Sequence, residues 1–516
     1  MAEHNLMTSS PQKMPDQTGA APAPFRQAFL FVAAITAWRL VVLFTDGVNL
    51  SFDEAQYWHW AQTPALGYFS KPPLIAWMIA LTTAVGGNGE AWVRLGATLS
   101  HAATALVLFG VARSLFRTRE DVDRIALWSA LIWITLPAVS VSAMIISTDA
   151  PLLLCWAVAL LALVRAVEDE GRAWRWWLLL GVAIGIGLLA KYAMAFFVVS
   201  LVLFLLVSPS DRLRLRQPGL WLALLTGFVV YSPNLLWNLL NGMASYRHTG
   251  ENANLKSDLF NPAELAEFLG SQFGVFGPLL FAVLLIIALV VLRRTWLVRR
   301  YRLLVCFVLP VLLAITLQSF LSRANANWAA TAFVAAVPLV TAWLMERDRW
   351  RWVLPVSASL HLLAAVALYN PAPLLSLAGV SMTSKLDLQK RLRGWDLVGD
   401  WSRDLVMKHP DLVPLFDDRK TMATLLYYAR PLMMPARMWN PEGKRLNHYE
   451  LSASLPAEPG GDFLLITRGD DLWVKPYFTR TEMISILRLP IYPDYALEVR
   501  AYRLTGFKGY AAGRAQ

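Results

Sequence analysis

The chain has few charged residues and few cysteines for its length. Only 16% of its 516 residues are Asp, Glu, Lys or Arg, while 56% are hydrophobic. An ordinary soluble domain has about 25% charged residues, so the composition indicates an integral membrane protein. The two cysteines, Cys155 and Cys306, both fall within apolar segments, which excludes a disulfide framework and a cysteine metal site.

Several ligand-binding motifs are also missing. The sequence has no glycine-rich phosphate loop of the form GxxxxGK, no soluble nucleotide-binding fingerprint and no His/Glu spacing typical of a zinc site. A soluble nucleotide substrate is therefore not expected. The net charge of +11 lies in short basic segments between apolar runs, a pattern typical of cytoplasmic loops, so we expect no nucleic-acid partner.

Long apolar segments dominate the first 370 residues. Eleven are long enough, or nearly so, to cross about 30 Å of hydrocarbon: 26–45, 94–115, 125–142, 150–166, 174–190, 192–207, 219–238, 267–292, 302–320, 328–345 and 352–369. A twelfth segment, 74–86, has about 13 residues, which favours an interfacial helix over a span. We interpret 1–25 as a disordered cytoplasmic tail, followed by an uncleaved anchor.

The basic residues predict the orientation of these spans. The segments 113–124, 165–175, 211–216, 293–302 and 346–351 are arginine-rich and fall on one face, which the positive-inside rule makes the cytoplasm. The opposite face holds the first outer loop, 46–93. Because 74–86 is too short to span, the turns at Asp149, Lys191 and Arg323 share the face of that loop.

The chain changes character after Pro371. Charge rises, long apolar runs end, and "LVPLFDD", "GGDFLLITRG" and "ALEVRAYRL" have the pattern of strands. The segment "RKTMATLLYYAR", between the first two, has the pattern of a helix. We therefore predict a transmembrane domain over 26–370 and a small α/β domain over 371–516, on the outer face.

The first outer loop begins with two adjacent acids in "SFDEAQYW". Ser51 and Glu54 have the spacing of a capping box, so capping and catalysis both remain open for Glu54. A helix starting here places Asp53 and Tyr57 on one face at the membrane interface. An acid beside an apolar wall is a candidate general base.

Three cations on the outer face are candidates for a phosphate site. Lys71 precedes two prolines, which favour an extended backbone before a new helix. Lys191 lies in a tight turn, and Arg323 lies at the outer end of a span. Snorkelling is the alternative for Lys71, but the three together predict a phosphate site at the membrane surface.

Seven motifs resemble those of a known family, and they occur in the same order. They are "FDEAQYW", "GYFSKPPLIAWM", "VRLGATLSHAATALVLFGVARSLF", "STDAPLLL", "GLLAKY", "SPNLLWN" and "RANANW". The chain resembles C-type membrane glycosyltransferases over residues 26–330. The nearest groups are the lipid A aminoarabinose transferases and lipopolysaccharide-core sugar transferases, with the protein O-mannosyltransferases more distant.

The resemblance implies a polytopic helical fold of the GT-C type and an inverting transferase in the bacterial inner membrane. Its donor is a single sugar on polyprenyl (undecaprenyl) phosphate. Its acceptor is lipid A, lipopolysaccharide core, another glycan or a protein, at the periplasmic face. A polytopic transporter or lipid flippase is the alternative, and a non-catalytic interaction protein is a second one.

The resemblance also assigns roles to residues. Asp53 matches the essential acid, beside Glu54 as a second catalytic candidate. Lys71 matches the lysine that contacts the donor phosphate, and Lys191 matches a lysine at the corresponding later turn. Arg323 is a further phosphate candidate because of its position at the outer end of a span. Candidates for acceptor or sugar binding are Tyr57, Tyr68, Asp149 and His248; a turn or N-cap role is the alternative for Asp149. Because cations serve the leaving phosphate, no cofactor is required, although a divalent metal is compatible. One departure is Ser70, where aminoarabinose transferases often have an acid.

Overall fold

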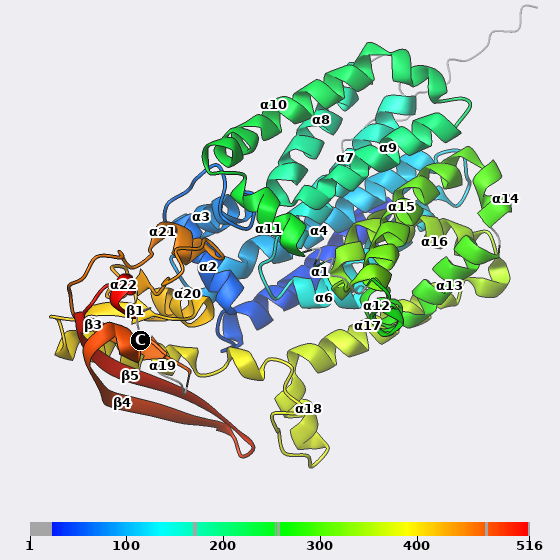
Figure 1. Cartoon of the computed structure of the whole chain (residues 1–516). Helices are drawn as coiled ribbons and strands as arrows, with labels where there is room; N and C mark the ends of the chain where they lie inside the picture. The colour runs from blue at the N-terminus through cyan, green and yellow to red at the C-terminus, as the bar shows by residue number, and fades with distance from the viewer. Residues whose placement is uncertain are drawn as a thin grey trace, which may run out of the picture.

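The computed structural model describes residues 23–168, 173–252, 254, 259–290, 292–469 and 473–513. A bundle of helices forms most of the molecule, and a small domain with a sheet lies at one end of it (Figure 1). We call this the domain end of the bundle and the opposite end the far end. The predicted polytopic helical fold with a C-terminal α/β domain is confirmed. Of the predicted tail 1–25, only 23–25 lie within the described residues.

Eight helices in the described part of the chain are long and apolar enough to cross a membrane, and they coincide with eight of the predicted segments. They are α1 (Ala23–Thr45), α4 (Glu90–Leu115), α7 (Asp149–Glu168), α8 (Ala173–Ala190), α10 (Pro218–Leu240), α15 (Arg299–Leu321), Ala326–Met345 with η3 and α16 (Ala330–Met345), and Asp348–Tyr369 with η4 and α17 (Val353–Tyr369).

The other three predicted segments are short or broken. Segment 125–142 is divided into α5 (Val122–Thr135) and α6 (Pro137–Ser142), because Pro137 has no N–H to continue the first helix. Segment 267–292 bends by 117° between α12 (Pro262–Phe276) and α13 (Pro278–Leu289). The bend falls at Gly277, whose φ of 88° is left-handed and favours glycine. Segment 192–207 is the short turn η1 (Tyr192–Met194) and α9 (Ala195–Val207).

Two short helices form the first outer loop at the domain end. The predicted interfacial helix is α3 (Leu74–Gly86), and α2 (Phe52–Ala61) precedes it. Helix α3 packs against both α2 and α4. The remaining short elements are η2 (Arg212–Arg216), α11 (Ala244–Asn252), α14 (Leu292–Leu297), η4 (Asp348–Trp350), α18 (Pro371–Leu377), η5 (Lys390–Leu392), η6 (Lys475–Tyr477) and α22 (Tyr510–Gly513).

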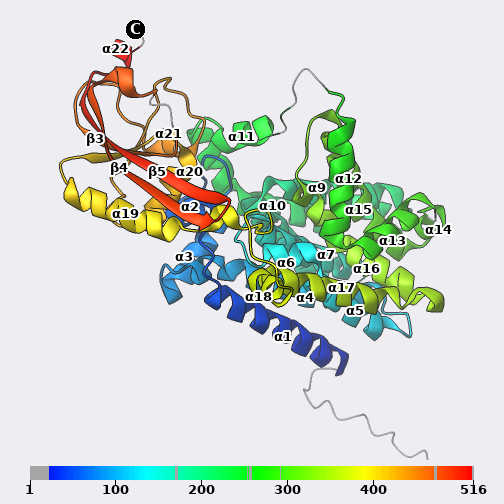
Figure 2. The ribbon, with the colours of Figure 1, turned by 90° about the horizontal axis from the view of Figure 1, so that it is seen from below.

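The C-terminal domain has a five-stranded mixed sheet in the order β2-β1-β3-β5-β4. Strand β1 (Val413–Phe416) is parallel to β2 (Arg437–Met438) and β3 (Phe463–Thr467), while β5 (Tyr495–Phe507) is antiparallel to β3 and β4 (Phe478–Tyr492). Helices α19 (Trp395–Lys408), α20 (Arg419–Tyr428) and α21 (His448–Ser452) complete the domain. The predicted strands β1, β3 and β5 and the predicted helix α20 are confirmed. The long β4–β5 hairpin was not predicted (Figure 2).

The C-terminal domain docks on the first outer loop through α20, which lies against α2 in both views (Figures 1 and 2). Tyr427 packs with Trp58 in one buried apolar cluster and donates a hydrogen bond from its hydroxyl to the Asn88 carbonyl at 2.6 Å. The Leu50 amide donates to the Tyr428 hydroxyl at 2.6 Å. Helix α20 is therefore fixed over α2, and its first residue lies beside the predicted site.

Candidate active site

The start of α2 is fixed by the predicted capping box. Ser51 is extended, and its hydroxyl accepts from the Glu54 amide at 3.3 Å, while the Glu54 carboxylate accepts from the Ser51 amide at 2.9 Å. This exchange satisfies two amides that a helix start leaves without partners. Because the helix begins here, Asp53 and Tyr57 lie one turn apart on the same face.

Glu54 is buried and has both carboxylate oxygens occupied. Arg94 of α4 binds it with two parallel hydrogen bonds of 2.8 and 3.0 Å, and the Ile146 amide donates to Oε1 at 3.0 Å. The residue has 0% exposure. Glu54 therefore ties α2 to α4 and to the segment before α7, which favours the capping interpretation over a catalytic role.

Asp53 is the open acid of the pair. Its side chain is 48% exposed, and Nη1 of Arg419 donates to its Oδ1 at 3.1 Å and to Gln56 Oε1 at 2.9 Å. Within the described residues, the second carboxylate oxygen has no hydrogen-bond partner. Arg419 and Gln56 were not predicted, since Arg419 comes from the C-terminal domain, 366 residues away in sequence.

Lys71 lies in the same outer loop, half-buried. No acceptor or acid in the described part of the chain binds its ammonium group. Burial lowers the pKa of Lys71, and the charge of Lys191 lowers it further, whereas Asp53 and Asp149 raise it. Lys71 therefore lies within electrostatic range of both acids, and its ammonium group is open to an incoming anion.

Asp149 and Lys191 form an ion pair beside Lys71. Asp149 begins α7 and Lys191 follows α8, and the Lys191 ammonium donates to Asp149 Oδ1 at 2.7 Å. The other oxygen accepts from the Asn327 amide nitrogen, also at 2.7 Å. Their side chains are only 22% and 10% exposed for Lys191 and Asp149. Asn327 was not predicted, although it lies in the "RANANW" motif.

His248 and Tyr57 lie near these charges. His248 is half-buried on α11, with its ring 5.4 Å from that of Phe69. Burial lowers the pKa of His248, and the charge of Lys71 adds to the effect. Tyr57 is buried, and burial, followed by the charge of Asp53, raises the pKa of its hydroxyl. Both predicted residues are therefore grouped with Asp53 and Lys71.

Besides Glu54, two predicted site residues, Tyr68 and Arg323, are not joined to this cluster. Tyr68 is buried, with its ring stacked 4.5 Å from that of Trp60 and its hydroxyl donating to the Trp60 carbonyl at 3.0 Å. It therefore supports the loop before Lys71. The exposed Arg323 side chain has no ion pair in the residues that the structure describes. Its turn reaches the cluster instead through Asn327.

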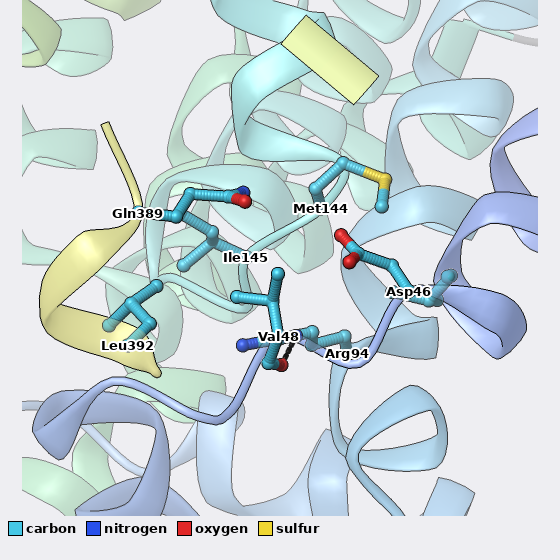
Figure 3. Close-up of a pocket in the computed structure, with 8 residues that line it drawn as sticks. Asp46, Val48, Arg94, Met144, Ile145, Gln389 and Leu392 are labelled. Carbon is cyan, nitrogen blue, oxygen red and sulfur yellow. Dashed lines mark hydrogen bonds between the residues drawn. The ribbon is translucent and has the colours of Figure 1, made fainter. Parts of the chain in front are cut away.

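The cluster is distinct from a small cavity at the end of α1 (Figure 3). That cavity has a volume of about 10 Å³, which is room for roughly one water molecule. Asp46, Val48, Arg94 and Met144 are among its lining residues, and Arg94 Nη1 donates to the Val48 carbonyl at 2.9 Å. The cavity is therefore too small for a sugar or a lipid phosphate.

The described residues contain no group of three or more His, Cys, Asp or Glu side chains that could hold a metal ion. The candidate site is thus a cluster of two acids and three cations at the domain end of the bundle. Asp149 is paired with Lys191 and Asp53 with Arg419, while Lys71 has no ion-pair partner among the described residues. Such a cluster can orient a nucleophile at Asp53 and bind an anionic leaving group at Lys71.

Comparisons with known proteins agree with this architecture. A family model described as dolichyl-phosphate-mannose-protein mannosyltransferase matches residues 70–237. The chain is 35% identical over 450 residues to the lipid A galacturonosyltransferase RgtD of Rhizobium johnstonii, covering 86% of this chain and 91% of that one. It is 30% identical over 177 residues, 31% of each chain, to the undecaprenyl phosphate-α-4-amino-4-deoxy-L-arabinose arabinosyl transferase of Pseudomonas aeruginosa.

A solved structure has the same fold. The crystal structure of ArnT from Cupriavidus metallidurans bound to undecaprenyl phosphate superposes with a TM-score of 0.60 at 17% identity, covering 92% of this chain and 97% of that one. The likeness extends through the C-terminal domain. With these motifs, this fold and a 35% identical relative matched over most of its length, the chain belongs to the family of C-type membrane glycosyltransferases that includes the rhizobial lipid A galacturonosyltransferase.

Proposed function

We propose that this membrane glycosyltransferase moves a single galacturonic acid residue from polyprenyl phosphate to lipid A or the lipopolysaccharide core. One observation carries the proposal: the half-exposed acid Asp53 lies within electrostatic range of Lys71, a cation with no partner among the described residues. This arrangement provides an acid for the acceptor and a free cation for the departing phosphate.

On the acceptor side, Asp53 acts through its free oxygen. It orients an acceptor hydroxyl and accepts its proton as the oxygen attacks the anomeric carbon. An acceptor phosphate is already ionised and requires orientation only. Tyr57, one turn along the same face of α2, borders the position of the incoming acceptor.

On the donor side, Lys71 takes the phosphate. The bond from the anomeric carbon to the phosphate oxygen breaks as the bond to the acceptor oxygen forms on the opposite face, which inverts the anomeric centre. Negative charge grows on the leaving phosphate, and Lys71 and Lys191 stabilise it more in the transition state than in the ground state. Because these cations supply the positive charge, the proposed reaction requires no metal ion.

The charge around the site supports an acidic sugar. Ser70, before Lys71, replaces the acid often found there in aminoarabinose transferases, so a negative charge that would attract an amino sugar is missing. The three cations Lys71, Lys191 and Arg419 outnumber the two acids, and this excess of positive charge attracts an acidic sugar to the site. The name of the 35% identical relative, a lipid A galacturonosyltransferase, supports the same sugar and acceptor.

We further propose that the domain end faces the periplasm of a bacterium and that the protein resides in the inner membrane. The arginine-rich segments 113–124, 211–216 and 293–302 lie at the far end of the helices, which the positive-inside rule makes the cytoplasmic end. The active-site cluster and the C-terminal domain then share the periplasmic side with the acceptor.

The experiment is a comparison of donors with the full chain in proteoliposomes. Undecaprenyl phosphate carrying galacturonic acid and undecaprenyl phosphate carrying aminoarabinose are supplied in turn with lipid A, and the products are identified by mass spectrometry. We expect transfer of galacturonic acid, undiminished by EDTA. Preferential transfer of aminoarabinose would contradict the proposed sugar, and loss of activity on metal removal would contradict the metal-free scheme.

A further inference from the structure

The C-terminal domain places one of its own side chains in the active-site cluster. Arg419 begins α20, directly after β1 and the turn of Asp417 and Asp418. The Asp418 side chain caps α20 by accepting from the Thr421 amide at 2.8 Å. A short turn and a capped helix fix the position at which Arg419 leaves the domain, so its approach to Asp53 is built into the fold.

Arg419 is held along only one side. Nη1 makes both of its hydrogen bonds, to Asp53 and Gln56, and the guanidinium carbon lies 4.9 Å from the centre of the Phe52 ring. Among the described residues, Nε and Nη2 have no acceptor, and the side chain is 28% exposed. A guanidinium whose Nε and Nη2 are both free presents a planar fork that fits a phosphate or a carboxylate.

The free side of Arg419 belongs to the same electrostatic environment as Lys71 and His248. Burial is the largest cause of the lowered pKa of both residues, and the charge of Arg419 lowers both further. The group thus contains three cations, Lys71, Lys191 and Arg419, against the two acids. A donor phosphate stabilised by Lys71 and Lys191 leaves the free side of Arg419 for a second anionic group.

We propose that Arg419 binds an anionic group of the acceptor, a phosphate or a carboxylate, and so places the neighbouring acceptor hydroxyl at Asp53. The inference rests on the proposed function, since it assigns part of the same site. The acceptor is favoured over the donor because Arg419 touches Asp53, the acid that handles the acceptor. Arg419 also comes from the domain outside the bundle, whereas the lipid donor arrives from the bilayer.

The test measures acceptor binding to the full chain in nanodiscs, with no donor present. Three probes are used: lipid A with its phosphates, dephosphorylated lipid A, and dephosphorylated lipid A extended by two acidic core sugars. We expect at least one anionic probe to bind about tenfold or more tightly than the neutral one. Arg419→Ala should remove this preference, weakening the anionic probe by about tenfold to a hundredfold, as for other charge-assisted hydrogen bonds.

Two further variants separate recognition from folding. Arg419→Lys keeps a charge that can pair with Asp53 but loses the planar fork, so it should fold normally and recover only part of the preference. Lys420→Ala is the matched control: Lys420 is exposed, lies 5.2 Å from the same Phe52 ring, and has no contact with Asp53 among the described residues. It should bind all three probes as the wild type does.

Each outcome decides the inference. It is overturned if the wild type binds the three probes equally, if Arg419→Ala keeps the preference, or if Lys420→Ala loses it to the same extent. A kinetic effect of Arg419→Ala confined to the donor KM also overturns it. Binding through Arg419 without galacturonic acid transfer would contradict only the proposed function, whereas transfer without a role for Arg419 would contradict only this inference.

Discussion

The two ends of the helix bundle each hold an acid beside cations. The two acids differ in their exposure to solvent and in how many of their carboxylate oxygens have hydrogen-bond partners. At the far end, Asp211 is 1% exposed in its side chain and accepts two hydrogen bonds from Arg299, at 2.6 and 2.8 Å, and one from Ser208 at 2.6 Å. At the domain end, Asp53 is 48% exposed, and one of its oxygens is free in the described structure.

The difference separates charges that hold the fold from charges that are available for chemistry. Burial would raise the pKa of Asp211, but hydrogen bonds from Arg299 and Ser208 outweigh it and lower the pKa to about 2. That acid is a permanent anion with its partners in place. Glu54, bound by Arg94, is a second acid whose two carboxylate oxygens both have partners, although it adjoins Asp53 in sequence. We call such acids closed, and we call Asp53, which has a free oxygen in the described structure, open.

The largest effect is expected from breaking the buried ion pair of Glu54 and Arg94 beside the active site. Glu54→Ala leaves the buried Arg94 charge without its partner, which typically costs about 3–5 kcal/mol. The free energy of unfolding of the full chain should fall by that amount, as measured by denaturant or thermal unfolding in nanodiscs. Glu120→Ala, at an exposed position, is the control, and a Glu54→Ala chain as stable as the control would contradict this assignment.

For Lys71 we expect a loss of activity without a loss of stability. Lys71→Ala should slow sugar transfer by about 100- to 1000-fold, or about 2.7–4 kcal/mol, which is the usual cost of removing one group that stabilises a developing charge. The unfolding transition should stay in place, because this side chain has no hydrogen-bond partner to lose in the described structure. Lys408→Ala, in an exposed part of α19, should leave the rate unchanged. A Lys71→Ala enzyme with the wild-type rate would refute its role.

A smaller effect is expected at the far end. Asp211→Asn removes charge-assisted hydrogen bonds and should reduce the free energy of unfolding by about 1–3 kcal/mol. The enzyme that remains folded should transfer sugar at the wild-type rate, since this cluster lies away from the substrates. Asp348→Asn, whose acid is 86% exposed, serves as the control. A loss of rate in the folded Asp211→Asn enzyme would show that the two ends are coupled.

The smallest effect concerns the pH dependence of domain docking. His448 of α21 lies 6.3 Å from His59 of α2, ring to ring, and also contacts Trp60 and Tyr68. Burial lowers the pKa of His448 to about 3 and also lowers that of His59. Below about pH 6.5 the unfolded chain takes up protons that the folded contact does not, so stability should fall by about 1 kcal/mol per pH unit.

Thermal unfolding between pH 7.5 and pH 5 measures this effect. His448→Phe should reduce the loss of stability on acidification, while His409→Gln, at a half-buried position at the end of α19, should keep it. Equal acid sensitivity in the wild type and His448→Phe would remove this contact as the cause.

Features encoded by local residues could be predicted from the sequence. The capping box of α2, the short length of α3 and the strands β1, β3 and β5 depend on neighbouring side chains, and each is confirmed. The breaks at Pro137 and Gly277 had local signals that hydropathy alone obscures. By contrast, the contacts of Arg419 with Asp53 and of Asn327 with Asp149 span 366 and 178 residues of sequence.

Such long-range contacts follow from domain docking and helix packing, which local patterns do not encode. The prediction that the outer turns share one face of the membrane correctly grouped Lys71, Asp149 and Lys191. It also included Arg323, whose side chain is exposed and lies outside the cluster. Adjacent acids show the same limit: sequence allowed two roles for Glu54, and its burial against Arg94 favours capping.

The most direct test of the role of Asp53, the open acid, is the single-turnover rate at which Asp53→Asn releases polyprenyl phosphate in proteoliposomes. Asparagine keeps the shape of the side chain and can still accept a hydrogen bond from Arg419, but it cannot take a proton from the acceptor. We predict that the rate falls by about 100- to 10,000-fold while the unfolding transition is unchanged. Release at the wild-type rate would contradict the assignment of Asp53. It would also contradict the distinction between this open acid and the closed acids Asp211 and Glu54.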